Sequence, residues 1–115
     1  MPTRVIIDTD PGIDDAIAIA LAVASPELDL LGVTTVGGNT GLENTTANAL
    51  RLLHLLRRDD VPVGAGAARA IAFEQELGDP SIHGRHGLGG VALAEPPREA
   101  DPRGALGLLT DLIEG

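Results

Sequence analysis

Blocks of hydrophobic and polar positions alternate along the chain and predict strands and helices in turn. Residues 4–7 form a short, β-branched apolar run typical of a buried strand. Residues 13–24 are rich in Ala and apolar on nearly all sides, which predicts a helix buried on more than one face. Further strands are predicted over 28–36 and 61–65. Strands separated by helices in this way favour a parallel sheet with right-handed crossovers.

Two more helices are predicted from their terminal residues. Thr40–Glu43 has the S/T-x-x-E pattern of a capping box, so a helix is expected to start at Thr40 and to end in the basic pair Arg57-Arg58. Asp101 and Pro102 offer an N-cap and a first-turn proline for a last helix. The apolar side of that helix is expected to comprise Leu106, Leu109, Leu112 and Ile113.

Residues 67–100 lack a clear period and contain many Gly and Pro residues. A stretch of that length without regular elements is typical of a functional loop. The last predicted helix has no strand after it, so the sheet is expected to keep an unpaired edge and the helices to leave apolar faces uncovered. The sequence thus predicts a single α/β domain over residues 1–115, an open parallel sheet with helices on both faces, incomplete at its C-terminus.

Composition excludes several classes of protein. The 115 residues carry 17 acidic and 8 basic side chains, a net charge of −9, which argues against a surface for nucleic acid or for an anionic membrane. The absence of cysteine excludes disulfides, thiolate zinc sites and cysteine nucleophiles. No signal peptide and no bilayer-spanning apolar stretch is visible, so a cytoplasmic protein is expected.

Four carboxylates fall within eight residues where the first strand passes into the first helix. Asp8 and Asp10, two residues apart, lean to the same side at the end of the strand. Asp14 and Asp15 lie in the first helical turn, about 100° apart around the axis. Asp10 and one of the helical acids are therefore expected to face a common point at the carboxyl end of the strand, where open α/β sheets bind ligands.

Electrostatics predicts a cation at this point. Two like charges about 4 Å apart repel by roughly 1 kcal/mol in water and roughly 4 kcal/mol at an effective dielectric constant of 20. A helix N-terminus returns only about 0.3–1 kcal/mol per carboxylate. Converging carboxylates therefore need a bound ion or a proton, and oxygen ligands favour Ca²⁺ or Mg²⁺. The alternatives are separate, solvated helix-start acids, and a phosphatase-like enzyme with Asp8 as nucleophile and Asp10 as acid.

Three segments together resemble one family. The sequence DTDPGIDDA over residues 8–16 looks like the signature of the inosine–uridine-preferring nucleoside hydrolases. TTVGGN over 34–39 and HGRHGLG over 83–89 resemble two further segments of that family, in the same order. The resemblance implies the Rossmann-like fold of these enzymes and hydrolysis of the N-ribosidic bond by a water activated by Ca²⁺, with Mg²⁺ the less favoured ion.

The resemblance also implies residue roles. Asp10 would ligate the ion and act as general base, Asp15 would be a second ligand, and Asp8 would complete the surroundings of the metal. Asp14 and Asn39 would bind the ribose hydroxyls.

His83 would lie near the leaving base, whereas His86 stands where the family more often has a small or acidic residue, so no role is assigned to it. The family's later metal ligands and its base-departure histidine have no counterpart in these 115 residues. The chain is therefore expected to be a fragment, weakly active or inactive alone, of an enzyme that forms homo-oligomers. A non-catalytic module that binds divalent cations is the alternative.

Overall fold

The computed structural model describes residues 2–38, 41–67, 93 and 95–115. Three strands and three helices are the regular elements of this part of the chain: β1 (Thr3–Thr9), α1 (Ile13–Ala24), β2 (Leu28–Thr35), α2 (Leu42–Leu55), β3 (Val63–Ala65) and α4 (Gly104–Glu114). The predicted alternation of strands and helices is confirmed, and the bounds of α1 are those expected from its Ala-rich run.

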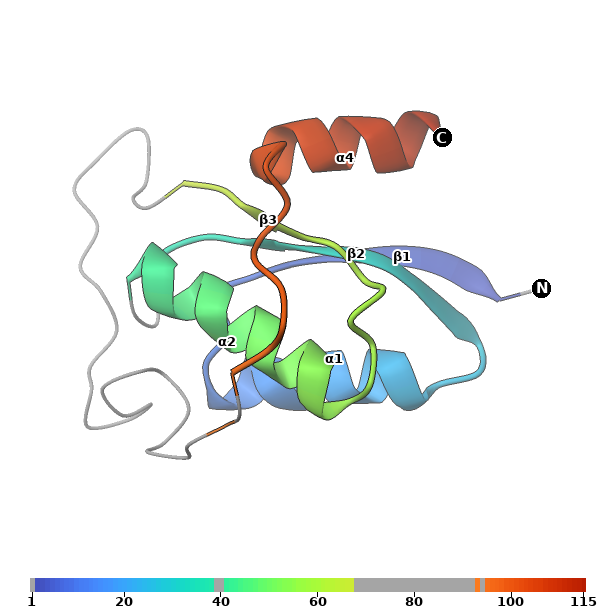
Figure 1. Ribbon diagram of the computed structural model, residues 1–115. Helices are drawn as coiled ribbons and strands as arrows, with labels where there is room; N and C mark the ends of the chain where they lie inside the picture. Colours follow the sequence, from blue (N-terminus) through green and yellow to red (C-terminus); the bar gives the residue numbers. More distant parts are fainter. Residues whose placement is uncertain (1, 39–40, 68–92, 94) are drawn as a thin grey trace.

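The strands form a parallel sheet in the order β1-β2-β3. Helices α1 and α2 lie on one face of this sheet and α4 lies on the other (Figure 1). The predicted architecture, an open parallel sheet with helices on both faces, is therefore confirmed. In the described part of the chain, β1 and β3 each pair only with β2, so both are edge strands.

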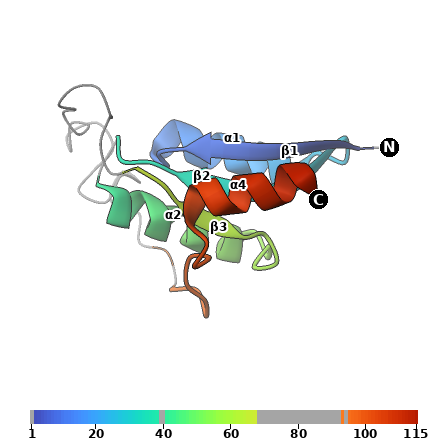
Figure 2. The same ribbon diagram turned by 90° about the horizontal axis from the view of Figure 1, so that it is seen from above.

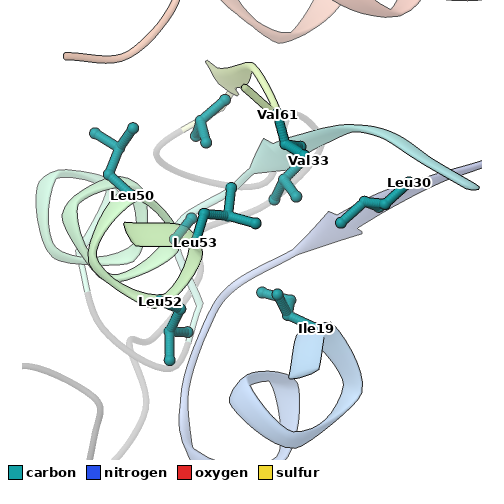
Figure 3. Packing of buried hydrophobic residues seen from close by; sticks show 9 residues of the cluster. Ile19, Leu30, Val33, Leu50, Leu52, Leu53 and Val61 are labelled. Carbon is teal, nitrogen blue, oxygen red and sulfur yellow. The ribbon is translucent and has the colours of Figure 1, made fainter. Parts of the chain in front are cut away.

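The core lies between the sheet and the layer formed by α1 and α2. Ile19 of α1, Val33 of β2 and Leu53 of α2 are all completely buried, and they point into the same space (Figure 3). The hydrophobic residues that the structure describes in this cluster are all aliphatic, as expected for a chain with a single aromatic residue. This packing fixes α2 against β2 and β3, and so fixes the position of the residues that α2 presents toward the carboxyl end of the sheet.

The predicted start and end of the second helix are wrong by a few residues. Helix α2 begins at Leu42 with Gly41 as its N-cap, because the first helical bond runs from the Thr45 N–H to the Gly41 carbonyl, 2.9 Å. Its last residue is Leu55. Arg57 adopts a left-handed backbone (φ 60°), and the Arg58 N–H donates to the Leu53 carbonyl, 2.8 Å. This bond pattern is a Schellman motif, which ends the helix before the basic pair.

The last helix also differs from its prediction. Arg103, not Asp101, is the N-cap of α4, and the Asp101 carboxylate instead accepts a hydrogen bond from the Arg103 N–H, 2.9 Å. The completely buried residue is Leu108, whereas Leu106 and Ile113 are 80% and 74% exposed. The predicted apolar face is therefore wrong in two of its four members.

Glycines in the sheet explain which side of α4 is buried. The helix lies across β2 and β3 (Figures 1 and 2). A Cβ atom on Gly32 would lie 2.6 Å from Leu112 Cδ1, and one on Gly64 would lie 2.8 Å from the Gly104 carbonyl oxygen. The two glycines thus allow the helix to approach the sheet closely, and they select the side that carries Leu108 and Leu112.

The residues before α4 are tied to the rest of the fold. Arg51 of α2 forms an ion pair with Glu95. The Asp101 N–H donates to the Val63 carbonyl of β3, 2.7 Å. The middle of the expected loop region, residues 68–92, lies outside the described residues, so the proposed role of residues 67–100 stays a prediction.

Candidate active site at the β1–α1 junction

The segment Asp8–Asp15, called here the acid elbow, joins β1 to α1 at the carboxyl end of the sheet. Thr9 is the last residue of β1, and α1 starts at Ile13 with Gly12 as its N-cap. The Gly12 carbonyl accepts the first helical bond from the Ala16 N–H, 3.0 Å. Pro11 and Gly12 are both buried, so the turn itself is part of the packed structure and not a solvated loop.

The structure places Asp10 against Asp15. Both carboxylates are half-buried, and a hydrogen bond links their side chains. Burial raises the pKa of Asp15 above its usual value, and the hydrogen bond and charge of Asp10 raise it further. The backbone N–H of Gly12 acts in the opposite direction. A carboxylate whose ionisation is opposed by a neighbouring carboxylate forms part of a site suited to a shared cation or proton.

Asp8 takes a different position. Its Oδ1 accepts a hydrogen bond from the hydroxyl of Thr34, 2.7 Å, and the two residues are direct partners in the β1–β2 ladder. Thr34 is completely buried, whereas Asp8 is exposed. Asp8 is thus held by β2, and its bond to Thr34 fixes the end of β1 just before the elbow turns.

Asp14 is exposed in the first turn of α1. Within the ranges that the structure describes, no group of three or more His, Asp or Glu side chains is arranged to hold a metal ion. The described residues therefore bring two of the predicted acids together, Asp10 and Asp15. Asn39, His83 and His86 lie outside the described residues, and the expected roles of Asn39 and His83 stay predictions.

Gly38 forms a wall of the site. A Cβ atom at this position would lie 2.9 Å from Asp10 Cγ and 3.1 Å from Asp10 Cβ, and closer still to Oδ2. Only a residue without a side chain leaves the Asp10 carboxylate where it is. The sequence carried a signal for this contact, since Gly37-Gly38 follows the second strand, but it reads equally well as ordinary turn chemistry.

Asn48 of α2 is hydrogen-bonded to the backbone of the elbow. Its side chain is completely buried, and its Nδ2 donates to the Pro11 carbonyl oxygen, 3.2 Å. The analysis of the sequence missed this residue. The available signal was its position, since a polar residue four places before Leu52 interrupts the apolar side of the helix.

The donor set fits a hard divalent cation. Asp10 and Asp15 offer four carboxylate oxygens. The Asp10 carboxylate lies against Gly38, in the space that a Cβ atom on that residue would need. Oxygen ligands of this kind suit Ca²⁺, which takes six to eight of them, so two carboxylates supply only part of a full coordination shell.

No helix in the described ranges has the length and hydropathy that a membrane span requires.

One protein-family model matches nearly the whole chain. Residues 5–115 match the model of the inosine-uridine preferring nucleoside hydrolases. The chain belongs to this family. The resemblance inferred from the three motifs is thereby confirmed, and the acid elbow lies within the matched nucleoside hydrolase region.

Individual nucleoside hydrolases agree with this assignment. The pyrimidine-specific ribonucleoside hydrolase RihA of Photobacterium profundum is 47% identical over 113 residues, which cover 98% of this chain and 36% of the relative. Two solved structures superpose closely. The plant nucleoside hydrolase PpNRh1 has a TM-score of 0.91 at 40% identity and covers 99% of this chain. The purine-preferring ribonucleoside hydrolase from Gardnerella vaginalis has a TM-score of 0.89 at 34% identity and covers 97%. The chain spans about a third of the length of these proteins, 36% in each case.

Proposed function

We propose that the acid elbow is the N-terminal part of a site that hydrolyses the N-glycosidic bond of ribonucleosides, giving ribose and free base. The observation that carries this proposal is the half-buried Asp10–Asp15 pair, whose carboxylates meet at the carboxyl end of a parallel sheet. Membership of the nucleoside hydrolase family supports it, and so does the oxygen-only donor set.

In this proposal Asp10 and Asp15 hold a Ca²⁺ ion, with Mg²⁺ the less suitable alternative. Bound Ca²⁺ supplies a Lewis acid that lowers the pKa of a water molecule. Asp10 would accept a proton from the attacking water, whose oxygen bonds to the anomeric carbon of the ribose as the bond to the base breaks. The base nitrogen would take up a proton as the base leaves, and the proton on Asp10 would return to solvent, so that one water is consumed for each bond broken. The half-buried carboxylates stabilise the positive charge that develops on the sugar ring, as in other glycoside hydrolyses.

The remaining predicted residues have roles around this pair. Asp14 and Asn39 bind the ribose hydroxyls, and His83 lies near the departing base. Asp8 contributes through its bond to Thr34, which holds the end of β1, in addition to any direct contact with the ion. The chain by itself is a fragment of the complete site and is weakly active or inactive, because two carboxylates do not fill the coordination shell of Ca²⁺. In its full-length form the protein is a cytoplasmic homo-oligomer.

Calcium binding is tested first, on the 115-residue chain. Calorimetric titration is expected to detect one Ca²⁺ per chain, and Asp10→Asn should remove this binding. Glu43→Gln is the matched control, since it also removes one acid from the first turn of a helix but on α2, outside the elbow. Binding that survives Asp10→Asn would place the ion elsewhere and overturn the assignment of the elbow.

Hydrolysis is tested in a chimera that joins these residues to the remaining two-thirds of the Photobacterium relative. The chimera is expected to release base from uridine or inosine, and its Asp10→Asn form should fold but release none. Binding of Ca²⁺ without turnover in the chimera would favour the non-catalytic cation-binding module instead. Rapid hydrolysis by the 115-residue chain alone would refute its expected lack of activity.

A further inference from the structure

Asn48 is a buried polar side chain on the packed side of α2, between residues that belong to the core. Its exposed fraction is zero, as are those of Ala49 and Leu53 beside it. Burying an amide costs free energy unless it forms hydrogen bonds, so an apolar residue would serve the core alone at least as well. The side chain therefore has a use outside the core of α2.

The hydrogen bond of Asn48 shows where that use lies. Its Nδ2 reaches Pro11, 37 positions earlier in the chain, and donates to the backbone carbonyl, 3.2 Å. Pro11 stands between Asp10 and Asp15 in the elbow, next to one and four residues before the other. Restraining this carbonyl restrains the turn that sets the distance between the two carboxylates.

Helix α2, which carries Asn48, is itself hydrogen-bonded to β2. The hydroxyl groups of Thr46 and Thr35 are hydrogen-bonded, 2.7 Å, which ties the first half of α2 to the end of β2. Thr35 is completely buried and pairs with Thr9, the last residue of β1. The amide of Asn48 thus extends from a helix that is itself fixed to the strand beside the elbow.

We propose that Asn48 is a positioning residue for the acid elbow: through the Pro11 carbonyl it holds Asp10 and Asp15 at the separation that a divalent cation requires. This inference deepens the proposed function and rests on it. The proposal gives Asn48 no part in the chemistry itself. Replacing a residue that orients metal ligands without binding the metal itself typically lowers metal affinity by about 10–100-fold.

The test compares Asn48→Leu with Thr45→Val in the 115-residue chain. Thr45 is also completely buried on α2, but its hydroxyl donates to the Leu42 carbonyl of the same helix, 3.0 Å. In each variant a completely buried side chain loses its hydrogen bond to a backbone carbonyl, so both are expected to unfold at lower urea concentration. Only Asn48→Leu is expected to weaken Ca²⁺ binding, by about tenfold or more in calorimetry.

A second measurement, made without metal, separates this inference from the proposed function. Backbone amide chemical shifts are expected to change over residues 10–15 in Asn48→Leu and to stay unchanged there in Thr45→Val. If the wild-type chain binds no Ca²⁺, the proposed function fails while these shifts still decide whether Asn48 positions the elbow. Asn48→Leu with unchanged elbow shifts, or with Ca²⁺ affinity weakened no more than in Thr45→Val, would overturn the inference.

Discussion

The substitution Gly38→Ala tests whether the position of the Asp10 carboxylate matters for the site. The new methyl carbon would lie 2.9 Å from Asp10 Cγ, whereas non-bonded carbon atoms pack at about 3.5–4.0 Å. The carboxyl group must therefore move by roughly 0.6–1.1 Å. Since the Asp10 side chain can move to another rotamer, the cost in folding free energy is expected to stay below about 1 kcal/mol.

The functional cost of the same change is expected to be much larger. A displacement of about 1 Å at a catalytic group can reduce a rate by about 10²-fold. Displaced supports of metal ligands reduce affinity by about 10–100-fold. Calorimetry on the 115-residue chain is therefore expected to give a Ca²⁺ dissociation constant at least about tenfold higher for Gly38→Ala than for the wild type.

Gly41→Ala provides the matched control. It adds the same methyl group three residues later, where no described atom outside its own chain neighbours lies within 4 Å. Gly41 has an extended backbone that alanine also adopts (φ −64°, ψ 156°). Its Ca²⁺ affinity is expected to match that of the wild type. Equal affinities for Gly38→Ala and the wild type would show that the Asp10 carboxylate does not bind the ion from this position, and the reasoning about the elbow would be wrong.

Three further predictions concern stability. Because the pKa of Asp15 is raised in the folded, metal-free protein, the contribution of this group to stability is fully present below pH 3.8 and is lost as the pH rises through the raised value. Asp15→Asn removes this loss of stability and is expected to raise the free energy of unfolding at pH 7 by about 1 kcal/mol. The same variant is expected to lose Ca²⁺ binding, and urea titrations with and without Ca²⁺ measure both effects. A variant less stable than the wild type would contradict the repulsion between Asp10 and Asp15. Leu108→Ala is expected to lower the free energy of unfolding by about 2–5 kcal/mol, because Leu108 is completely buried. Leu106→Ala, at an 80% exposed position, should change it by less than about 0.5 kcal/mol. Similar urea midpoints for the two variants would refute the assigned buried face of α4. Arg57→Gly is expected to raise the thermal midpoint, since glycine adopts φ 60° without the strain of about 1 kcal/mol that an L side chain incurs there; a lower midpoint would mean that the arginine side chain contributes more than its backbone costs.

Local patterns were sufficient to predict the first half of the fold. The apolar run and the Pro-Gly turn define β1 and the start of α1, and the end of α1 follows from Pro26, since the residue before a proline leaves the helical region. The site acids lie within this half, so the proximity of Asp10 to one acid of the helix could be inferred from spacing alone. Both features depend on residues that are neighbours in sequence.

Features that depend on contacts between distant segments could not be predicted in this way. Helix α4 is apolar on several sides, and its buried side is selected by Gly32 on a strand more than 70 positions earlier. The support that Asn48 gives to Pro11 likewise joins residues on two elements whose relative position is set by the core. The predicted N-cap of α2 is wrong by one residue, because Thr40–Glu43 fits the capping pattern with Thr40 as the cap, whereas the structure has Gly41 in that position.

The supports of the acid elbow come from β1, β2 and the first half of α2, and this has a consequence for biosynthesis. Thr34, Gly38 and Asn48, which contact the elbow or its carboxylates, are all among the first 48 residues. Translation runs from the N-terminus, so these groups leave the ribosome before residues 49–115 do. A divalent ion bound at that stage would offset the repulsion between Asp10 and Asp15 in the nascent chain.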